Sequence, residues 1–274
     1  MASVPGRGNP VHQRLIADDG TVVRAEHRPP TSGKRSAAIV IVHGFMLHSS
    51  HPYMRRVAGW LDGGADMADV VRTAPAVDDP SEPVVDPGLI LLDMRGHGRS
   101  NGVSTLGWYE VLDVAAAVQW ARALGYAKVV TLGFSLGAAV VLRHAALIGG
   151  VDRVAAVSGP GQWFFRGTAR MRFMHHLVLT APGRFAVRTL RRTRITSQDW
   201  PDPLPIDPTA AARMATVPVL VVHGDMDDLF PTWHAERIAD AAANGEVWLV
   251  PGFGHAEAAL DPELAGRLRE WLVT

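Results

Sequence analysis

The feature that most constrains the fold is an alternation between short apolar runs and longer segments with helical periodicity. The runs are rich in β-branched residues and lack a polar face; they cover residues 37–42, 89–92, 128–132, 153–157, 217–222 and 246–250. Such runs are typical of a parallel sheet that is covered on both faces. Helices are predicted at residues 108–124, 136–147, 233–243 and 261–272. Asp261 and Pro262 supply an N-cap and a first helical position for the last helix.

Residues 11–17 and 21–28 flank the turn signal Asp18-Asp19-Gly20 and predict an antiparallel hairpin at the start of the chain. Together with the alternation, this hairpin predicts an α/β fold. We expect a mostly parallel, eight-stranded sheet with helices on both faces.

Two segments interrupt the alternation. Residues 62–88 are rich in acids and prolines, with Arg72 as their one basic residue, and they indicate an insertion between a helix and the next strand. Residues 159–216 carry nine arginines against three aspartates and separate two strands. We expect them to form a small helical cap, so that residues 1–158 and 217–274 make up the core.

Composition excludes several classes of protein. The 27 basic and 27 acidic residues of this 274-residue chain balance, which argues against nucleic-acid binding. The absence of cysteine excludes disulfides, zinc–thiolate sites and a cysteine nucleophile. No dinucleotide-binding or Walker A glycine loop occurs. Without an apolar leader or a run of roughly 18 apolar residues, we expect a cytoplasmic protein with no transmembrane segment.

The pattern G-x-S-x-G occurs twice, around Ser100 and around Ser135. A β-branched run leads directly into Gly133-Phe134-Ser135-Leu136-Gly137, and a helical segment follows it at once. A sharp turn from a strand to a helix exposes the serine hydroxyl at the edge of the sheet, next to the positive end of the helix. Ser100 lies between two loops and has no such helix. Ser135 is therefore the predicted nucleophile, against the simpler alternative of a tight turn without chemistry.

Four further stretches resemble the α/β-hydrolase superfamily, in the order of that family. They are His43-Gly44-Phe45, residues 93–100 (DMRGHGRS), residues 223–231 (HGDMDDLFP) and residues 252–255 (GFGH). The nearest subgroups are serine-aminopeptidase-like and monoacylglycerol-lipase-like hydrolases. The resemblance spans residues 43–255, and neither the expected cap nor the acidic insertion matches a pattern within it.

The resemblance implies a catalytic triad of Ser135, Asp227 and His255. A serine hydroxyl needs a base within hydrogen-bonding reach, and that base needs a third group to orient it. His255 follows the last predicted strand on a glycine-rich turn. The family's spacing assigns the acid to Asp227, while Asp225 and Asp228 remain alternatives.

Other residues of the matched motifs are given supporting roles. The backbone N–H groups of Phe45 and Leu136 are expected to form the oxyanion hole. His43, His97 and His223 are expected to be structural, and Asp93 is expected to fix a loop rather than serve as the acid.

The expected cap suggests where a substrate binds. Trp163, Phe164 and Phe165 are candidate substrate-binding residues, because aromatic side chains of the cap could line an acyl pocket. Interleaved arginines would suit an anionic acyl carrier, a lipid headgroup or weak contact with a membrane surface. The simpler alternative is a cap that packs its apolar face on the body and leaves its arginines in water.

The sequence therefore predicts an esterase or lipase-like serine hydrolase of a small-molecule acyl substrate, with no cofactor and no metal. A thioesterase or an amide hydrolase would use the same residues. A non-catalytic ligand-binding member of the superfamily is the alternative from another class, although none of the three triad residues is missing.

Overall fold

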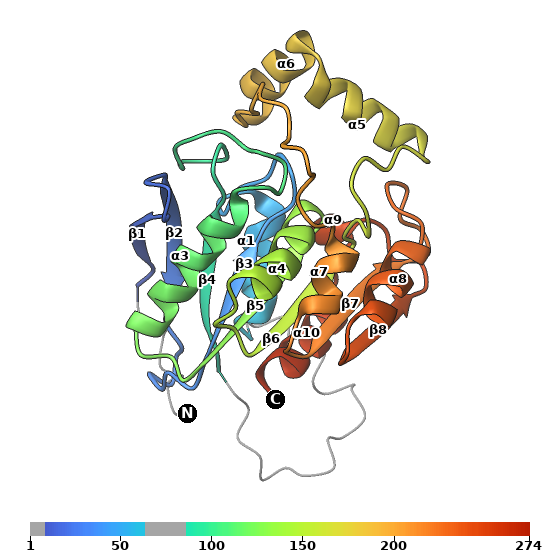
Figure 1. Ribbon diagram of the computed structural model, residues 1–274. Coiled ribbons are helices and arrows are strands. Elements are labelled where there is room, and N and C mark those ends of the chain that lie inside the picture. Colours follow the sequence, from blue (N-terminus) through green and yellow to red (C-terminus); the bar gives the residue numbers. More distant parts are fainter. Residues whose placement is uncertain (1–8, 64–85) are drawn as a thin grey trace.

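The computed structural model of this chain describes residues 9–63 and 86–274, and its core is a single eight-stranded sheet (Figure 1). The strands are β1 (Val11–Ile16), β2 (Val22–Arg28), β3 (Ala37–Val42), β4 (Gly88–Asp93), β5 (Lys128–Phe134), β6 (Arg153–Val157), β7 (Val219–Gly224) and β8 (Gly245–Val250). They lie in the order β1-β2-β4-β3-β5-β6-β7-β8. The hairpin β1–β2 is antiparallel and β2 joins β4 antiparallel, while the strands from β4 to β8 run parallel. The predicted fold class and the predicted hairpin are confirmed.

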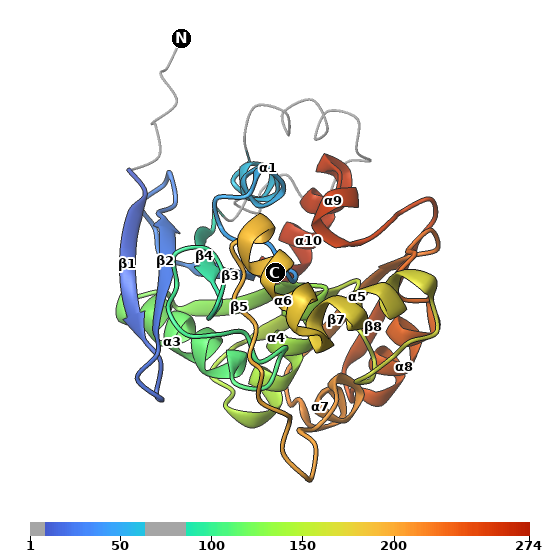
Figure 2. The same cartoon turned by 90° about the horizontal axis from the view of Figure 1, so that it is seen from above.

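Helices cover both faces of the sheet. They are α1 (Pro52–Leu61), α3 (Glu110–Ala123), α4 (Leu136–Leu147), α5 (Ala169–Leu179), α6 (Ala181–Arg191), α7 (Pro208–Met214), α8 (Trp233–Ala241), α9 (Ala256–Ala259) and α10 (Pro262–Val273). One apolar core joins the sheet to α3, α4, α7 and α8, and a second core joins its other face to α1, α9 and α10 (Figure 2). Among the described helices, none combines the length and the apolar character needed to cross a bilayer.

The central strands are buried because their side chains are apolar on both faces. All six residues of β3 (AAIVIV) are buried, as are all six of β4 (GLILLD). The prediction that every apolar run is covered on both faces is wrong for β8, whose residues are exposed or half-buried. This strand is at the edge of the sheet, so it pairs with β7 alone, and Val247 and Leu249 remain exposed.

The two interrupting segments differ in what the structure describes. Most of the acidic insertion predicted at residues 62–88 lies outside the described residues. Residues 159–216 contain α5, α6 and α7. Of these, α7 packs against α4 and α8, with Ala211 and Ala212 buried in the core. Helices α5 and α6 instead stand above the body of the molecule (Figure 1).

Candidate active site

The serine of the second G-x-S-x-G motif lies in a strained turn between β5 and α4. Ser135 has φ 51° and ψ −114°, and its N–H donates to the carbonyl of Val157 at 2.8 Å. A non-glycine residue in this region of backbone space costs on the order of 1–3 kcal/mol, and such strain is concentrated at functional sites. The turn also places the serine at the N-terminus of α4, where developing negative charge is favoured.

The two glycines of this motif are required by close backbone contacts. A Cβ atom on Gly133 would lie 2.3 Å from the carbonyl oxygen of Gly137. A Cβ on Gly137 would lie 2.3 Å from the carbonyl oxygen of Val42, at the end of the adjacent strand β3. Only glycine at both positions lets the turn approach its own helix and β3 so closely.

Loops that follow β7 and β8 bring an acid and a base to this turn. The Ser135 hydroxyl lies 2.9 Å from Nε2 of His255, and Nδ1 of the same ring lies 2.7 Å from Oδ2 of Asp227. The carboxylate is the acceptor for Nδ1–H, which leaves Nε2 free to accept the serine proton. The three predicted residues, distant in sequence, therefore form one continuous hydrogen-bonded chain.

The carboxyl group of Asp227 is held in its charged form. Its burial would raise the pKa, but the hydrogen bond and charge of His255 and the N–H groups of Phe230 and Leu229 together lower that pKa below its usual value. These N–H groups donate to Oδ1 at 3.0 and 2.8 Å, so the two carboxylate oxygens have separate partners. Asp227 can thus orient the imidazole and stabilise it when it is protonated.

The alternative acids have other partners. Asp225 accepts a hydrogen bond from the Gly252 N–H at 2.7 Å, and Asp228 forms an exposed ion pair with Arg170. Asp93 accepts from the N–H groups of Ser49 and Arg99, so it fixes loops. None of these contacts involves His255.

The hydroxyl of Ser100, the serine of the first G-x-S-x-G motif, also has hydrogen-bond partners outside the chain at Ser135. Ser100 is buried; its hydroxyl donates to the carbonyl of Asp93 at 2.5 Å and accepts from the Arg24 N–H at 2.8 Å. With both hydrogen-bonding functions used by backbone groups, this hydroxyl has a structural role.

The three remaining motif histidines are buried and their burial lowers the pKa of each. Nδ1 of His43 lies 2.7 Å from the carbonyl oxygen of Gly44, and its Nε2 accepts from the Met94 N–H at 3.2 Å. His97 bonds the carbonyl of Arg95, and His223 bonds that of Phe230. These rings hold the loops around the site in place.

Glu257 is a site residue that the sequence analysis missed. It lies in the short helix α9, two residues after His255, and it is 4% exposed. Its Oε1 accepts a hydrogen bond of 2.5 Å from the N–H of Gly44, in the loop expected to supply an oxyanion donor. A Cβ on Gly44 would lie 3.0 Å from that oxygen and 3.3 Å from Cβ of Ser135. No helical period or motif marks Glu257, so the sequence alone offered no signal for it.

The predicted oxyanion donors border the serine. Leu136 is the first residue of α4, where a backbone N–H has no acceptor within its own helix. Phe45 follows Gly44 and lines the same cavity as Ser135 and Leu136. Both main-chain groups thus come from segments that adjoin the serine.

A cavity of about 570 Å³ opens at Ser135, between the carboxyl end of the sheet and helices α5 and α6. The predicted substrate-binding residues Trp163, Phe164 and Phe165 all line it. Trp200 packs edge-on against Trp163 at 5.0 Å and lies 5.2 Å from Phe164. Arg184 and Asp199 also border the cavity, and its remaining apolar lining comes from Leu106, Pro160, Met171, Met174, Val178, Leu179, Leu204, Leu229 and Phe230.

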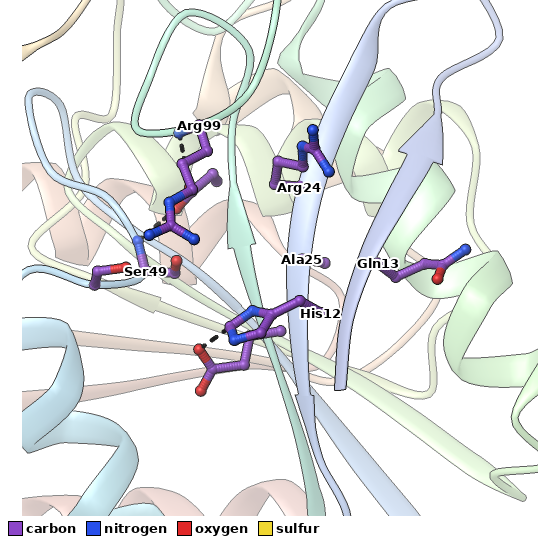
Figure 3. A pocket seen from close by; sticks show the side chains of 9 residues that line it. His12, Gln13, Arg24, Ala25, Ser49 and Arg99 are labelled. Carbon is purple, nitrogen blue, oxygen red and sulfur yellow. Dashed lines mark hydrogen bonds and ion pairs between the residues drawn. The ribbon is translucent and has the colours of Figure 1, made fainter. Parts of the chain in front are cut away.

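A second, smaller cavity of about 180 Å³ lies beside the β1–β2 hairpin (Figure 3). His12, Arg24 and Arg99 contribute to its lining, together with the buried Glu26. Glu26 pairs with Arg28 and Arg55, outside the hydrogen-bonded chain at Ser135. Across residues 9–63 and 86–274, no group of three metal-ligating side chains is close enough to hold a metal ion.

A mostly parallel eight-stranded sheet, with a strained serine turn after β5, defines the α/β-hydrolase class of fold. The chain belongs to the alpha/beta hydrolase family, because the sequence model of that family matches residues 39–265. A comparison with curated proteins finds no match.

Several solved esterases share this fold. The esterase Pf2001 of Pyrococcus furiosus is 17% identical with a TM-score of 0.68, over 96% of this chain and 92% of that one. Est1E of Butyrivibrio proteoclasticus, solved with ferulic acid bound, is 20% identical with a TM-score of 0.62, over 94% and 97% of the two chains. RhEst1 of Rhodococcus is 18% identical with a TM-score of 0.66, over 96% and 98%. At these identities the likeness is one of fold.

Proposed function

We propose that this protein is a serine hydrolase that cleaves carboxylic esters through an acyl-enzyme on Ser135. The observation that carries the proposal is the hydrogen-bonded chain from the Ser135 hydroxyl through His255 to Asp227, with contacts of 2.9 and 2.7 Å. Contacts of this length meet the geometric requirement for a nucleophile, its base and the group that orients the base.

The reaction proceeds in two halves. As the Ser135 oxygen attacks the ester carbonyl carbon, Nε2 of His255 takes the hydroxyl proton. The tetrahedral intermediate collapses, the C–O bond to the alcohol breaks, and His255 gives its proton to the departing oxygen. Water then attacks the acyl-enzyme with His255 as base, and the acid is released as the Ser135 hydroxyl is restored. Asp227 stabilises the imidazolium in both halves.

The negative charge on the carbonyl oxygen is assigned to the N–H groups of Phe45 and Leu136. One such donor contributes about 2.7–4 kcal/mol to lowering the barrier. The N-terminus of α4 adds a favourable field at the same point. Because both donors belong to the main chain, side-chain truncation tests them poorly.

An apolar acyl or alcohol group fits the cavity at Ser135. Its aromatic wall, with Trp163, Phe164 and Phe165 as proposed substrate contacts, favours an ester with an apolar group. Ester cleavage is further supported by the fold shared with named esterases, one of them holding ferulic acid. The cap predicted at residues 159–216 is narrowed in this proposal to residues 159–206, because α7 packs in the core against α4 and α8. The apolar lining favours the monoacylglycerol-lipase-like subgroup over the aminopeptidase-like one.

Labelling with a fluorophosphonate probe tests the nucleophile directly. We expect the probe to attach to Ser135, and we expect Ser135→Ala to fold normally but lose at least about 10³-fold in turnover of a p-nitrophenyl ester. Ser100→Ala serves as the matched control, because that hydroxyl is bound by backbone groups. An unlabelled serine in folded protein would favour a ligand-binding protein, and labelling without ester turnover would favour a thioester or amide substrate.

A further inference from the structure

Arg184, a residue of helix α6, places a positive charge in the lining of the largely apolar cavity at Ser135. Its side chain is half-buried, and it forms no ion pair with a carboxylate in the part of the chain that the structure describes. From Gly159 to Gln198 the chain contains no Asp or Glu. A guanidinium that lines an apolar cavity without a counter-ion loses hydration and gains no ion pair in return. The missing counter-ion points to a ligand that supplies it.

One hydrogen bond holds this guanidinium in place. Nη1 of Arg184 donates to the carbonyl oxygen of Val178, near the end of α5, at 3.1 Å. A guanidinium has five N–H donors, so the others remain available to a ligand. A simpler role for Arg184 is to cap α5, because basic side chains often bind the last carbonyl groups of a helix. Capping alone does not require a place in the lining of the cavity.

The position of Arg184 in its helix favours an anion beside it. Arg184 is the fourth residue of α6, close to the helix N-terminus, where the helix dipole disfavours a positive charge and favours a negative one. Leu179, which precedes α6, and Arg184 both line the cavity, so this N-terminus adjoins it. The guanidinium and the helix end therefore favour negative charge at the same place.

Arg184 lies in a part of the cavity that is remote from the nucleophile. In Figure 1 the junction between α5 and α6 stands above the carboxyl end of the sheet, where the turn with Ser135 lies. Side chains of α5 add an apolar wall to the same cavity, namely Met171, Met174 and Val178. An ester bound at Ser135 would lay an apolar chain along this wall and present the far end of that chain to Arg184.

Two other ionisable side chains of the lining limit the charge of the ligand. Asp199 is exposed and forms no ion pair with Arg184. Nε2 of His175 lies 3.0 Å from the carbonyl oxygen of Phe165, and burial lowers the pKa of this ring, so it is neutral near pH 7. Arg184 thus balances a single negative charge, while Asp199 would repel a doubly charged phosphate. A carboxylate matches the planar guanidinium, which binds it through two parallel hydrogen bonds.

We propose that Arg184 is a specificity-determining residue that binds a carboxylate of the substrate, so that the preferred substrates are esters with an apolar chain that ends in a carboxylate. This inference rests on the proposed ester hydrolysis and names the class of ester. The carboxylate gives Arg184 the counter-ion that the surrounding protein lacks, and the apolar chain packs against the wall of the cavity.

Paired series of esters test this proposal. The mono-p-nitrophenyl esters of linear dicarboxylic acids, from adipic to dodecanedioic acid, are compared with p-nitrophenyl alkanoates of the same chain lengths. A second pair, the acetate esters of ω-hydroxy acids and of the matching alcohols, places the carboxylate on the alcohol side. The measurement is the ratio of kcat/KM for each carboxylate ester to that of its neutral partner. We expect this ratio to peak at one chain length in one of the pairs, because the chain must span from Ser135 to Arg184.

Substitutions of the two charged lining residues should move the ratio in opposite directions. Arg184→Gln should lower it at least about tenfold at the preferred chain length, mainly through a higher KM for the carboxylate ester, because the lost ion pair is remote from the reacting carbonyl. Arg184→Lys keeps the charge without the planar fork and should lose less. Asp199→Asn removes an exposed like charge and should raise the ratio about twofold.

Arg188→Gln is the matched control. Arg188 lies one turn further along α6, is exposed and does not line the cavity. Its replacement removes the same charge from the same helix and should leave the ratio unchanged.

A ratio that is the same in the parent and in Arg184→Gln, at every chain length of both pairs, would overturn the proposal. An equal loss of turnover for both esters of a pair would assign Arg184 to the capping of α5 instead, and an equal fall of the ratio in Arg188→Gln would reduce the effect to the general charge of the helix. Hydrolysis of neutral esters with no dependence on Arg184 would remove the specificity alone. If no ester of either kind is hydrolysed, the proposed function itself fails, and this inference fails with it.

Discussion

At the scale of single residues, Glu257 is the group that ties the loop of Gly44 to the helix after His255. The carboxyl of Glu257 is buried, and burial raises its pKa above the usual value. The hydrogen bond that it accepts from the Gly44 N–H acts in the opposite direction. Gly44 precedes Phe45, one of the proposed oxyanion donors. A carboxyl that fixes Gly44 therefore fixes where the Phe45 N–H points. We regard Glu257 as a positioning residue, since the hydrogen bonds of the His255 ring go to Asp227 and Ser135 and that of the Glu257 carboxyl goes to Gly44.

Two substitutions of Glu257 should distinguish its role as a hydrogen-bond acceptor from the effect of its negative charge. Glu257→Ala removes the acceptor and should lower kcat about tenfold or more with KM nearly unchanged, because an oxyanion donor contributes mainly in the transition state. Glu257→Gln keeps a carbonyl oxygen at the same position and should stay within about threefold of the parent. Steady-state kinetics on p-nitrophenyl esters, with active sites counted by fluorophosphonate titration, measures both.

Equal losses in the two Glu257 variants would assign the effect to charge. Unchanged kcat per titrated site in Glu257→Ala would reduce the residue to a structural role.

The choice of the acid that orients His255 shows how much of the site the sequence alone can predict. Asp225, Asp227 and Asp228 lie within four residues, and nothing local distinguishes them. Their partners do: the Gly252 N–H, the His255 ring and the Arg170 guanidinium. The interpretation that favoured Asp227 came from the spacing of a resembling family. The contact that separates the candidates lies 28 residues away in sequence.

At the scale of elements, the turn from β5 to α4 depends on backbone contacts that exclude a side chain. Gly137→Ala should destabilise the protein by more than about 3 kcal/mol, because its Cβ would overlap the Val42 carbonyl, a rigid strand atom. Urea unfolding measures the change. A shift below 1 kcal/mol would mean that β3 and α4 can separate.

Gly59→Ala is the matched control for that substitution. Gly59 lies within α1, and a Cβ there would meet no atom within 4 Å. Alanine should stabilise the helix by about 0.5–1 kcal/mol, since glycine costs that much in a helix interior.

The elements that the sequence predicted best are those with a strong local signal. The strand ranges 37–42 and 153–157 and the helix 136–147 coincide with β3, β6 and α4. The burial of β8 could not be predicted, because its composition resembles that of the central strands and only its place in the sheet leaves it exposed. Helix α7 was missed for a related reason: its segment is short, and its partners α4 and α8 are distant in sequence.

At the scale of the whole molecule, buried histidines make the free energy of unfolding depend on pH. Burial lowers the pKa of His144 to about 4, and both ring nitrogens of this α4 residue lack a hydrogen-bond partner among the described residues. The unfolded chain therefore binds a proton near pH 6.5, before the folded protein does. The contribution of His144 to stability is complete above pH 6.5 and declines as the pH falls toward 4.

His144→Leu should reduce this sensitivity to acid. The free energy of unfolding of the parent should fall between pH 6.5 and pH 4, and the variant should recover up to about 3 kcal/mol of that fall. Near pH 7 the two proteins should be of similar stability, since no hydrogen bond of the ring is lost. Urea titrations at several pH values measure the free energy of unfolding of both proteins. If it falls equally with pH in the parent and in the variant, His144 is excluded as a source of the acid effect.

The reacting groups and the walls of the cavity come from different parts of the chain. Ser135, Asp227 and His255 lie on loops that follow β5, β7 and β8, whereas most of the cavity lining lies between Pro160 and Leu204. Mutational libraries confined to that interval can accordingly explore new ester preferences while the chemistry stays constant. The same separation lets substrate preference evolve independently of the catalytic chemistry.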